Sequence, residues 1–500
     1  MDSFFLAVSQ TINPYALVML MFGVIGGIVV GAIPGMTANM AVAIMTSLSF
    51  GMDSMVAIML LIGVYFGSMY GGSISAILLH IPGTPSAVMT AKDGYPMGQR
   101  GEAGRAIGIA TFASFSGGMI SMVFLMLAAP ILSKMALRFS APEYFALACF
   151  GLSIVASLDS NSLARGVVSA LLGVMLCMIG MDPITGIQRF TFGIPEFSDG
   201  IGFIPVMIGL FGMAEIFKQL ASTSTGWVPQ KLTGVLPSWV QIKQLASTIF
   251  RSALIGTGIG ALPGAGGSIA CFVAYDHIKK RSKHPEKFGT GIPEGIAAPE
   301  SANNAVTGGA LMPLLTLGVP GDSVTAIMLG AFILHKITPG AMLFVEQPHV
   351  VYGIYISGIL ANVFMAIVGF SSAGLFARLI SFPKYVLLPV ILLLCVVGSF
   401  AVHNSMFDVY VMLVFGLVGY ILSKLDMPLT PLILGVVLGP ILEENLRLTI
   451  TMSNNNFFYY FCTRPIAMFF MLVTILCVVL PTAIRNIKLR SKDKQGQTTE

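Results

Sequence analysis

The feature that most constrains this 500-residue chain is a series of long apolar runs that carry almost no charge. Examples are PYALVMLMFGVIGGIVVGAI (14–33), FIPVMIGLFGMAEIF (203–217) and PIAMFFMLVTILCVVLP (465–481). A helix needs about 20 residues to cross the hydrocarbon core of a bilayer. Hydrophobic residues make up 55% of the chain and charged residues only 10%, which cannot cover a soluble globule. We therefore expect an all-α polytopic membrane protein of roughly 10–14 helices, including broken or re-entrant ones.

Basic residues gather in two short stretches, 279–287 and 485–494, each beside an apolar run. Short basic segments flanking membrane helices mark the cytoplasmic side, so we expect the C-terminus to lie in the cytoplasm. The same clustering accounts for the net charge of +5 without nucleic-acid binding. The six cysteines form no CxxC pair, and we interpret them as small apolar core residues.

Helix-breaking motifs occur twice inside apolar runs, as GAIPG at 31–35 and as GALPG at 260–264. Downstream, GGSISAILLHIPGTPSA (71–87) resembles GGALMPLLTLGVPGDSVTA (308–326), so each half contains a second Pro-Gly pair. These matches predict an internal repeat. We assign 1–219 to a first transmembrane repeat, 220–250 to a polar linker, 251–484 to a second transmembrane repeat, and 485–500 to a basic, polar cytoplasmic tail.

Loop charges indicate how the repeats are oriented. Five bases lie between 279 and 287, whereas the matching loop at 51–54 has no lysine or arginine. This opposite bias is typical of two inverted-topology repeats. The linker bases Lys231, Lys243 and Arg251 leave an alternative open. If both flanks of 252–278 are cytoplasmic, that segment is a re-entrant hairpin.

Broken helices at membrane depth need a physical reason. An unpaired backbone group in hydrocarbon is costly, so a break is tolerated where it is buried or lines a polar cavity. Free helix N-termini attract anions, and free carbonyl groups can hold cations. Four matched breaks therefore predict one central binding site at the repeat interface. The alternative is that proline and glycine merely kink the helices.

The most polar run of the second half is APESANNAVTGG at 298–309. Together with the PGDS motif at 320–323, it supplies oxygen ligands of the type that suits Na⁺ or a hydrogen-bonded carboxylate. The cation-binding candidates are Glu300, Ser301, Asn303, Asn304, Thr307 and Asp322, and a sodium ion would bind at these residues. The alternative is that they hydrogen-bond neighbouring helices.

The chain shows no nucleophile beside a plausible base, no GxxxxGK[ST] loop and no other metal-ligand spacing. We therefore expect neither an enzyme nor direct ATP drive, and no cofactor.

Over almost its whole length the chain resembles the large membrane subunit of the tripartite tricarboxylate transporters, the TctA family. The resemblance is carried by GAIPGMTANMAVAIM (31–45), YGGSISAILLHIPGTPSAVMTAKDGYPMGQRGEAGRA (70–106), GALPGAGGSIA (260–270), APESANNA (298–305), LTLGVPGDSVTAIMLGA (315–331) and PLILGVVLGPILEENLRL (431–448).

The resemblance implies a secondary carrier of the bacterial inner membrane that works with a small four-helix membrane subunit and a periplasmic solute-binding protein. It implies uptake of di- or tricarboxylates such as citrate, or of other organic acids, coupled to Na⁺ or H⁺. The resemblance leaves open whether the chain forms a homo-oligomer. No lysine or arginine lies at the helix tips, so we expect substrate carboxylates to bind helix N-termini. The substrate-binding candidates are Gly35, Thr37, Asn39, Gly83, Thr84, Ser86, Gly266, Gly267, Ser268, Gly321 and Ser323.

Three residues depart from the usual family pattern, namely His80, Lys92 and Asp322. An acidic side chain at a substrate-binding tip would repel a carboxylate, so Asp322 bears on the choice of substrate or binds the coupling cation. Two other classes remain open: a channel with re-entrant hairpins, and a membrane scaffold without coupled flux.

Overall fold

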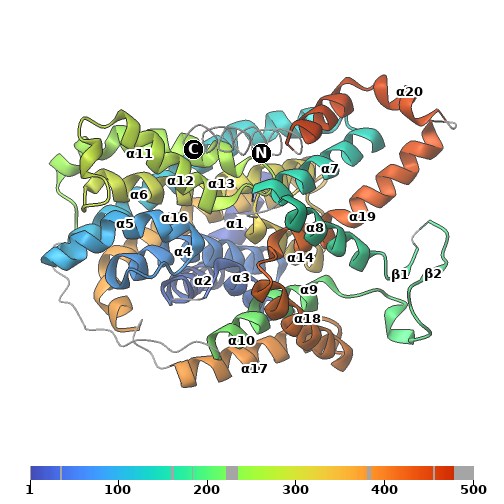
Figure 1. Ribbon diagram of the computed structural model, residues 1–500, viewed down its shortest axis with the longest axis horizontal. Coiled ribbons are helices and arrows are strands. Elements are labelled where there is room, and N and C mark those ends of the chain that lie inside the picture. Colours follow the sequence, from blue (N-terminus) through green and yellow to red (C-terminus); the bar gives the residue numbers. More distant parts are fainter. Residues whose placement is uncertain are drawn as a thin grey trace, which may run out of the picture. The chain divides into compact units, whose positions relative to one another are not determined.

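The computed structural model describes residues 2–33, 36–158, 163–182, 184–220, 235–379, 384–453 and 456–477. Within these residues the chain is almost entirely helical, and its one sheet is a two-stranded hairpin (Figure 1). Seven helical segments are long and apolar enough to cross a membrane, and six shorter apolar helices accompany them. The prediction of an all-α polytopic membrane protein is confirmed.

The described residues fall into two compact units, and the first consists of residues 1–137 and 202–421. In chain order its helices are α1 (Asp2–Thr11), α2 (Pro14–Ala32), α3 (Ala38–Leu48), α4 (Ser54–Leu79), η1 (Pro85–Ala87), α5 (Val88–Met97), η2 (Gly98–Glu102), α6 (Ala103–Ala136), α9 (Phe203–Met207), η4 (Ile208–Met213), α10 (Ala214–Leu220), α11 (Trp239–Gly260), α12 (Gly266–Arg281), η5 (Pro285–Lys287), α13 (Pro293–Leu317), α14 (Ser323–Leu334), α15 (Leu343–Glu346), α16 (Pro348–Leu379), α17 (Lys384–His403) and most of α18 (Met406–Lys424).

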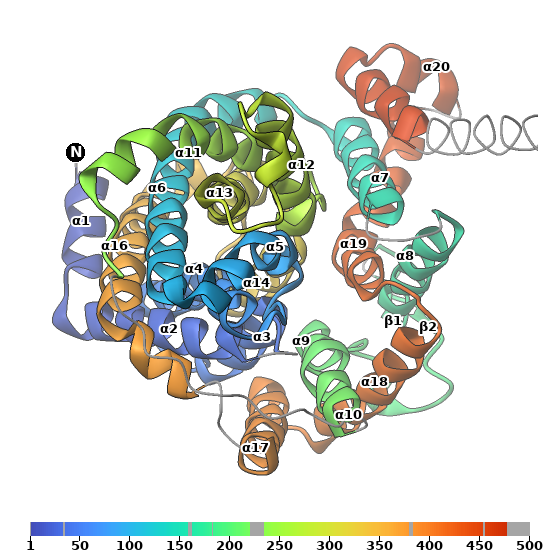
Figure 2. The same ribbon diagram turned by 60° about the vertical axis from the view of Figure 1, so that its left-hand side comes forward.

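Two helices of the first unit, α4 and α13, are enclosed by protein. All residues of α4 from Met55 to Leu78, and of α13 from Gly295 to Thr316, are buried. Figure 2 looks nearly along α13 and shows α5, α6, α11 and α12 around it. A helix that is surrounded by protein needs no polar face toward solvent. The polar run at 298–309 therefore lies in the interior of this unit.

Glycines bring the helix pairs α2–α4 and α11–α13 into backbone contact. A Cβ atom on any of four glycines would collide with a backbone carbonyl oxygen of the opposite helix. The colliding pairs are Gly27 with Val64, Gly31 with Ser68, Gly256 with Ala302, and Gly260 with Val306. Residues 256 and 260 follow 27 and 31 by 229 positions, and 302 and 306 follow 64 and 68 by 238. The two helix pairs thus pack through matched positions.

Each of these four helices ends at an expected break and is followed by a shorter helix. The breaks lie at 33–37, 80–84, 261–265 and 318–322. Helices α4 and α13 both end in a left-handed residue, His80 with φ 59° and Gly318 with φ 70°. Helices α11 and α12 pack against each other across the third break, so 239–281 forms a helical hairpin with GALPG at its tip.

The sequence boundaries are only partly covered by the structure. Helix α11 begins at Trp239 and includes the last residues of the stretch assigned to the linker. Residues 221–234 and the tail at 485–500 lie outside the described residues. The limits of the two repeats and their inverted orientation remain predictions.

The second unit consists of residues 138–201 and 422–500. Its elements are α7 (Ala141–Leu158), α8 (Leu163–Cys177), strands β1 (Gly180–Met181) and β2 (Gln188–Arg189), η3 (Pro195–Phe197), α19 (Leu429–Met452) and α20 (Phe457–Cys462). Helix α19 packs against both α7 and α8. A Cβ on Gly173 of α8 would collide with the carbonyl oxygen of Leu432, so small residues again set the helix spacing.

Candidate functional site

The helices that follow the four breaks meet in pairs at their N-termini. Helix α3 contacts α14, and Ser323 Oγ donates a hydrogen bond of 3.0 Å to Asn39 Oδ1. Helix α12 contacts η1, and a Cβ on Gly267 would lie 3.2 Å from Cβ of Ser86. Each pair joins the helix after a first break to the helix after the second break of the other half.

The two breaks within each half also touch. A Cβ on Gly83 would collide with the carbonyl oxygen of Gly31. In the same way, a Cβ on Gly321 would lie 2.5 Å from the carbonyl oxygen of Gly260, and the Gly264 amide donates to the Gly321 carbonyl at 2.7 Å. All four breaks therefore converge, and Gly83 and Gly321 are required there because a Cβ at either position would collide with the backbone of the other break.

The two pairs of N-termini differ in how their backbone amides are satisfied. The side chains of Thr37 and Asp322 accept hydrogen bonds from first-turn amides of α3 and α14, at 3.2 and 2.7 Å. We call these N-termini the capped tips. Thr84 and Ala265, which precede η1–α5 and α12, make no side-chain cap. We call these the open tips, because their first amides keep no side-chain acceptor.

Asn303 lies beside the open tips with an unpartnered oxygen. Its side chain is fully buried, and Nδ2 donates to the carbonyl oxygen of Met69 at 2.8 Å. Since only the nitrogen can donate to a carbonyl, this bond fixes the amide orientation. Oδ1 has no hydrogen-bond partner and would lie 2.8 Å from a Cβ on Gly267. A buried acceptor without a donor is costly, and this one faces the first turn of α12.

Glu300 is a second unusual group of α13. The side chain is fully buried, and its carboxyl oxygens accept from Thr90 Oγ1 at 2.5 Å and Ser114 Oγ at 3.0 Å. Among the described residues no lysine, arginine or histidine forms an ion pair with it. A hydroxyl can either donate or accept, so both partners of this carboxyl can reorient.

Asp322 is satisfied by the protein itself. Oδ1 accepts from the amide and the hydroxyl of Thr325, and Oδ2 accepts from Tyr65 Oη at 2.7 Å. The side chain of Asp322 thus caps α14 and joins it to α4. Gly266 lies close by, because a Cβ there would be 3.8 Å from Cβ of Asp322.

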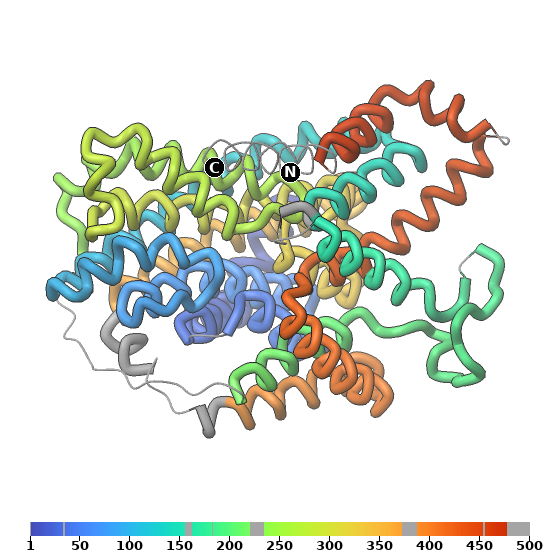
Figure 3. Tube along the Cα trace, in the orientation of Figure 1, coloured from blue at the N-terminus to red at the C-terminus, as the bar shows by residue number. Residues whose placement is uncertain are grey.

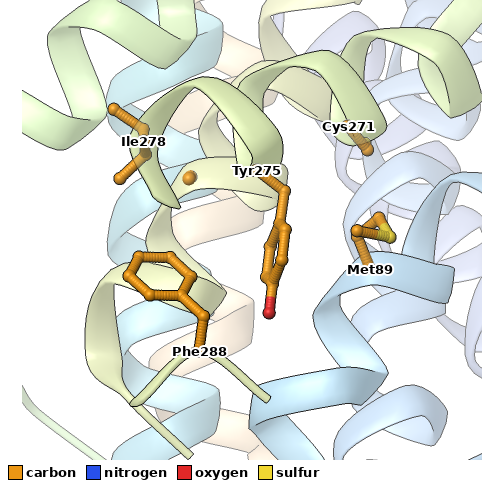
Figure 4. Packing of buried hydrophobic residues seen from close by; sticks show 6 residues of the cluster. Met89, Cys271, Tyr275, Ile278 and Phe288 are labelled. Carbon is orange, nitrogen blue, oxygen red and sulfur yellow. The ribbon is translucent and has the colours of Figure 1, made fainter. Parts of the chain in front are cut away.

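Asp93, which the sequence did not single out, anchors α5 to the loop before α13. Its Oδ1 accepts from the amides of Gly289, Gly291 and Ile292 at 2.8–3.0 Å, and its Oδ2 accepts from Tyr275 Oη at 2.8 Å. Apolar packing surrounds this anchor, and Figure 4 shows the Tyr275 ring between Phe288 and Met89. The anchor holds the start of α13 beside α5.

Comparison with known proteins identifies the family of this chain. A family model described as the tripartite tricarboxylate transporter TctA family matches residues 17–434. The chain belongs to the TctA family. It is 38% identical over 478 residues to an "Uncharacterized 52.8 kDa protein in TAR-I ttuC' 3'region" of Agrobacterium vitis, covering 95% of each chain. An "Uncharacterized protein in TAR-II ttuC' 3'region" of the same organism is 40% identical over 225 residues, which is 45% of this chain and 93% of that protein. No solved structure is significantly similar.

Family membership establishes a multi-pass subunit of a tripartite transporter, in a transport family rather than an enzyme family. In this TctA-family chain, the predicted site residues that lie at the converging breaks include Asn39, Gly83, Ser86, Gly267, Gly321, Asp322 and Ser323. Other predicted residues hydrogen-bond to groups away from the breaks. Ser301 Oγ donates to the Ile249 carbonyl of α11, and Thr307 Oγ1 to a carbonyl of its own helix. The amide oxygen of Asn304 is buried and unpartnered. Ser268 is partly exposed in the first turn of α12, and Gly35 lies outside the described residues.

Tyr65, Thr90 and Ser114 of this TctA-family chain were missed by the sequence prediction. Tyr65 pairs with Asp322, and the other two pair with Glu300, across sequence separations of 186 to 257 residues. A hydroxyl inside an apolar helix gives no local signal of such a partner. These side chains are recognised only once the helices are packed.

Proposed function

We propose that this chain is the large membrane subunit of a secondary active transporter that imports organic carboxylates, di- or tricarboxylates such as citrate, by cation symport. A small four-helix membrane subunit and a periplasmic solute-binding protein complete the proposed transporter in the bacterial inner membrane, with the C-terminus of this subunit in the cytoplasm. Family membership supports the tripartite organisation.

The observation that carries the proposal is the meeting of the two open tips beside Asn303. Helix N-termini favour anions because their amides point outward and the helix dipole is positive there. In the proposed site, a substrate carboxylate accepts hydrogen bonds from the first amides of α12 and from the amide of Ser86, since Pro85 at the start of η1 has no N–H. Ser86 and Gly267 bring these two N-termini within contact distance of each other.

The coupling cation, Na⁺ or H⁺, is proposed to bind to side chains of α13, next to the substrate carboxylate. Asn303 Oδ1 is a free acceptor beside Gly267, and Glu300 lies about one turn earlier with only hydroxyl partners. A cation there attracts the carboxylate, so each ligand strengthens the binding of the other. Such mutual strengthening is the thermodynamic requirement of symport.

The test is uptake of labelled carboxylates into vesicles that contain this subunit, the small subunit and the binding protein, under imposed Na⁺ or H⁺ gradients. We expect saturable accumulation that follows one gradient. Asn303→Ala should raise the half-saturating substrate or cation concentration about tenfold, since leaving a buried polar group without its partner costs about 1–3 kcal/mol.

Asn362→Ala is the matched control, because Asn362 of α16 is also buried with an unpartnered amide oxygen and packs on α6, where a Cβ on Gly118 would meet it. Equal uptake by the two variants would remove Asn303 from the site. A current that never saturates with substrate, independent of the imposed gradient, would identify a channel instead.

A further inference from the structure

A loop in the second unit exposes large apolar side chains that the described protein does not cover. We call residues 178–201 the hairpin loop; Figure 3 traces it directly after α8. Phe192 is 81% exposed and Phe190 58%. The exposed apolar side chains of this loop are Met181, Ile184, Ile187, Phe190, Phe192 and Ile194. Exposed apolar groups on this scale indicate a contact outside the chain.

The hairpin loop has a defined structure in spite of this exposure. Strands β1 and β2 pair with Gly180 opposite Arg189, and the Asp182 amide donates to the Ile187 carbonyl at 2.9 Å. The side chain of Asp182 accepts from the Ile184 amide and from Thr185 Oγ1. Non-helical backbone does not contact lipid within the hydrocarbon core, so a loop of this kind can meet the bilayer only in its interfacial region.

Helix α8 is too short to cross the hydrocarbon core alone. Its 15 residues span about 22 Å, whereas the core is about 30 Å thick. One face of α8, formed by Gly166, Ser169, Ala170 and Gly173, is buried in the second unit. The opposite face exposes Val168, Leu171, Leu172 and Met175. The hairpin loop follows directly after the end of α8.

The charges of the second unit show where the apolar surface ends. Arg165 and Asp426, 3.8 Å apart and largely exposed, lie near the starts of α8 and α19 and mark one aqueous boundary. Arg447 lies 18 residues after Leu429, the first residue of α19, which is about 27 Å along the helix axis. This distance is close to the thickness of the hydrocarbon core. The hairpin loop is attached to α19 at this level.

The attachment is a closed set of four charges. Arg189 pairs with Glu443 at 2.5 Å, and Arg447 pairs with Asp182 at 2.8 Å and with Glu443 at 3.3 Å. Two acids and two bases leave no net charge, and pairing lowers the cost of placing them near hydrocarbon. Leu448 of α19, just beyond them, is again exposed and apolar.

We propose that the hairpin loop lies in the interface of the lipid bilayer and completes the lipid-facing surface that α8 is too short to provide. The apolar side chains contact the boundary between acyl chains and headgroups, as the Phe and Leu side chains of interfacial helices do. Phe190 and Phe192 have φ values of 54° and 51°, a left-handed conformation that is rare for aromatic residues and is held here where both rings project outward. The lipid is the occupant because the loop follows directly after α8, whose exposed face is apolar.

The test uses one tryptophan as a depth reporter in the full chain. The two native tryptophans, Trp227 and Trp239, are changed to phenylalanine, and Phe192→Trp is introduced. Val168→Trp on the exposed face of α8 is the lipid control, and Lys283→Trp in the exposed basic loop after α12 is the water control. Each variant is reconstituted into vesicles with brominated phospholipids, and quenching by the bromine and by aqueous iodide is compared.

We expect the tryptophan of Phe192→Trp to emit at short wavelength and to be quenched by brominated lipid to an extent comparable with Val168→Trp, with little quenching by iodide. Emission and iodide quenching equal to those of Lys283→Trp would overturn the proposal and leave the loop in water, free for a protein partner. Protection from iodide that appears only when a solute-binding protein or small subunit is added would also overturn it. If Phe192→Trp does not fold, Ile187→Trp gives the same readout. The result is independent of whether the chain transports carboxylates.

Discussion

The open tips and the capped tips have the same origin in the sequence but different chemistry in the structure. Both follow Pro-Gly breaks, and both pair a helix of one half with a helix of the other. At the capped tips, Thr37 and Asp322 already satisfy first-turn amides, and Ser323 bonds to Asn39. At the open tips the first amides have no side-chain cap. Matched breaks therefore supply a scaffold, and the cap residue decides which N-termini remain available to an anion.

The two buried carboxyl groups near the breaks, Asp322 and Glu300, also differ in the hydrogen-bond partners that hold them. Asp322, at a capped tip, accepts a backbone amide that can only donate, so its carboxylate is held as an acceptor. Glu300 accepts hydrogen bonds from the hydroxyl of Thr90 in α5, the helix that follows an open tip, and from the hydroxyl of Ser114 in α6. Among the described residues the partners of Glu300 are hydroxyls, which can reorient around a cation, whereas Asp322 is held by a backbone amide in addition to its two hydroxyl partners. This comparison favours the open tips over the capped tips as the position of the proposed ligands.

The largest effect is expected from Glu300→Gln compared with Asp322→Asn, two acid-to-amide changes of equal size. Glu300→Gln should abolish accumulation against a gradient, because the carboxyl that joins the cation is gone while both hydroxyls keep a partner. Asp322→Asn should retain near-normal uptake, since asparagine is as good an N-cap as aspartate. Gradient-driven uptake into vesicles measures both, with membrane insertion checked in parallel. The reverse ranking would make Asp322 the cation ligand and end the distinction between the tips.

A smaller but substantial effect is expected at Gly267. The Cβ of Gly267→Ala would lie 2.8 Å from Asn303 Oδ1 and 2.9 Å from Met69 Cε, so it crowds the open tips. We expect the half-saturating substrate concentration to rise about tenfold or more, since overpacking costs about 1–3 kcal/mol. Concentration-dependent uptake measures this change.

Gly258→Ala is the matched control for Gly267→Ala, because a Cβ at Gly258 meets nothing within 4 Å. Its uptake should equal that of the parent. If Gly267→Ala also leaves substrate affinity unchanged while inserting normally, the carboxylate does not bind at the open tips.

The sequence predicted the membrane helices and their breaks better than it predicted which helix N-termini are capped and which are open. Long apolar runs and repeated Pro-Gly motifs are local signals, so the membrane helices and their breaks could be read directly. Asp322 was singled out from the sequence as a site residue, but its bond to Tyr65 spans 257 residues and depends on how α4 packs against α14. Asp93 was missed because a single acid in a polar motif does not reveal the three distant amides that it binds. Local patterns specify where helices stop, whereas tertiary packing specifies which polar groups are left unpaired.

The smallest effect is expected at the capped tips, in a double-mutant cycle of Asn39→Ala and Ser323→Ala. One neutral hydrogen bond of 3.0 Å joins these side chains. Its loss should cost about 0.5–1.5 kcal/mol of stability, and the double variant should lose little more than either single variant. Substrate affinity should change less than about threefold, because a structural contact of this size affects uptake only through the folded fraction. Thermal unfolding in detergent measures the stability, and vesicle uptake measures the affinity. A loss of affinity as large as that of Gly267→Ala would place substrate at the capped tips as well, and all four breaks would then form one continuous site.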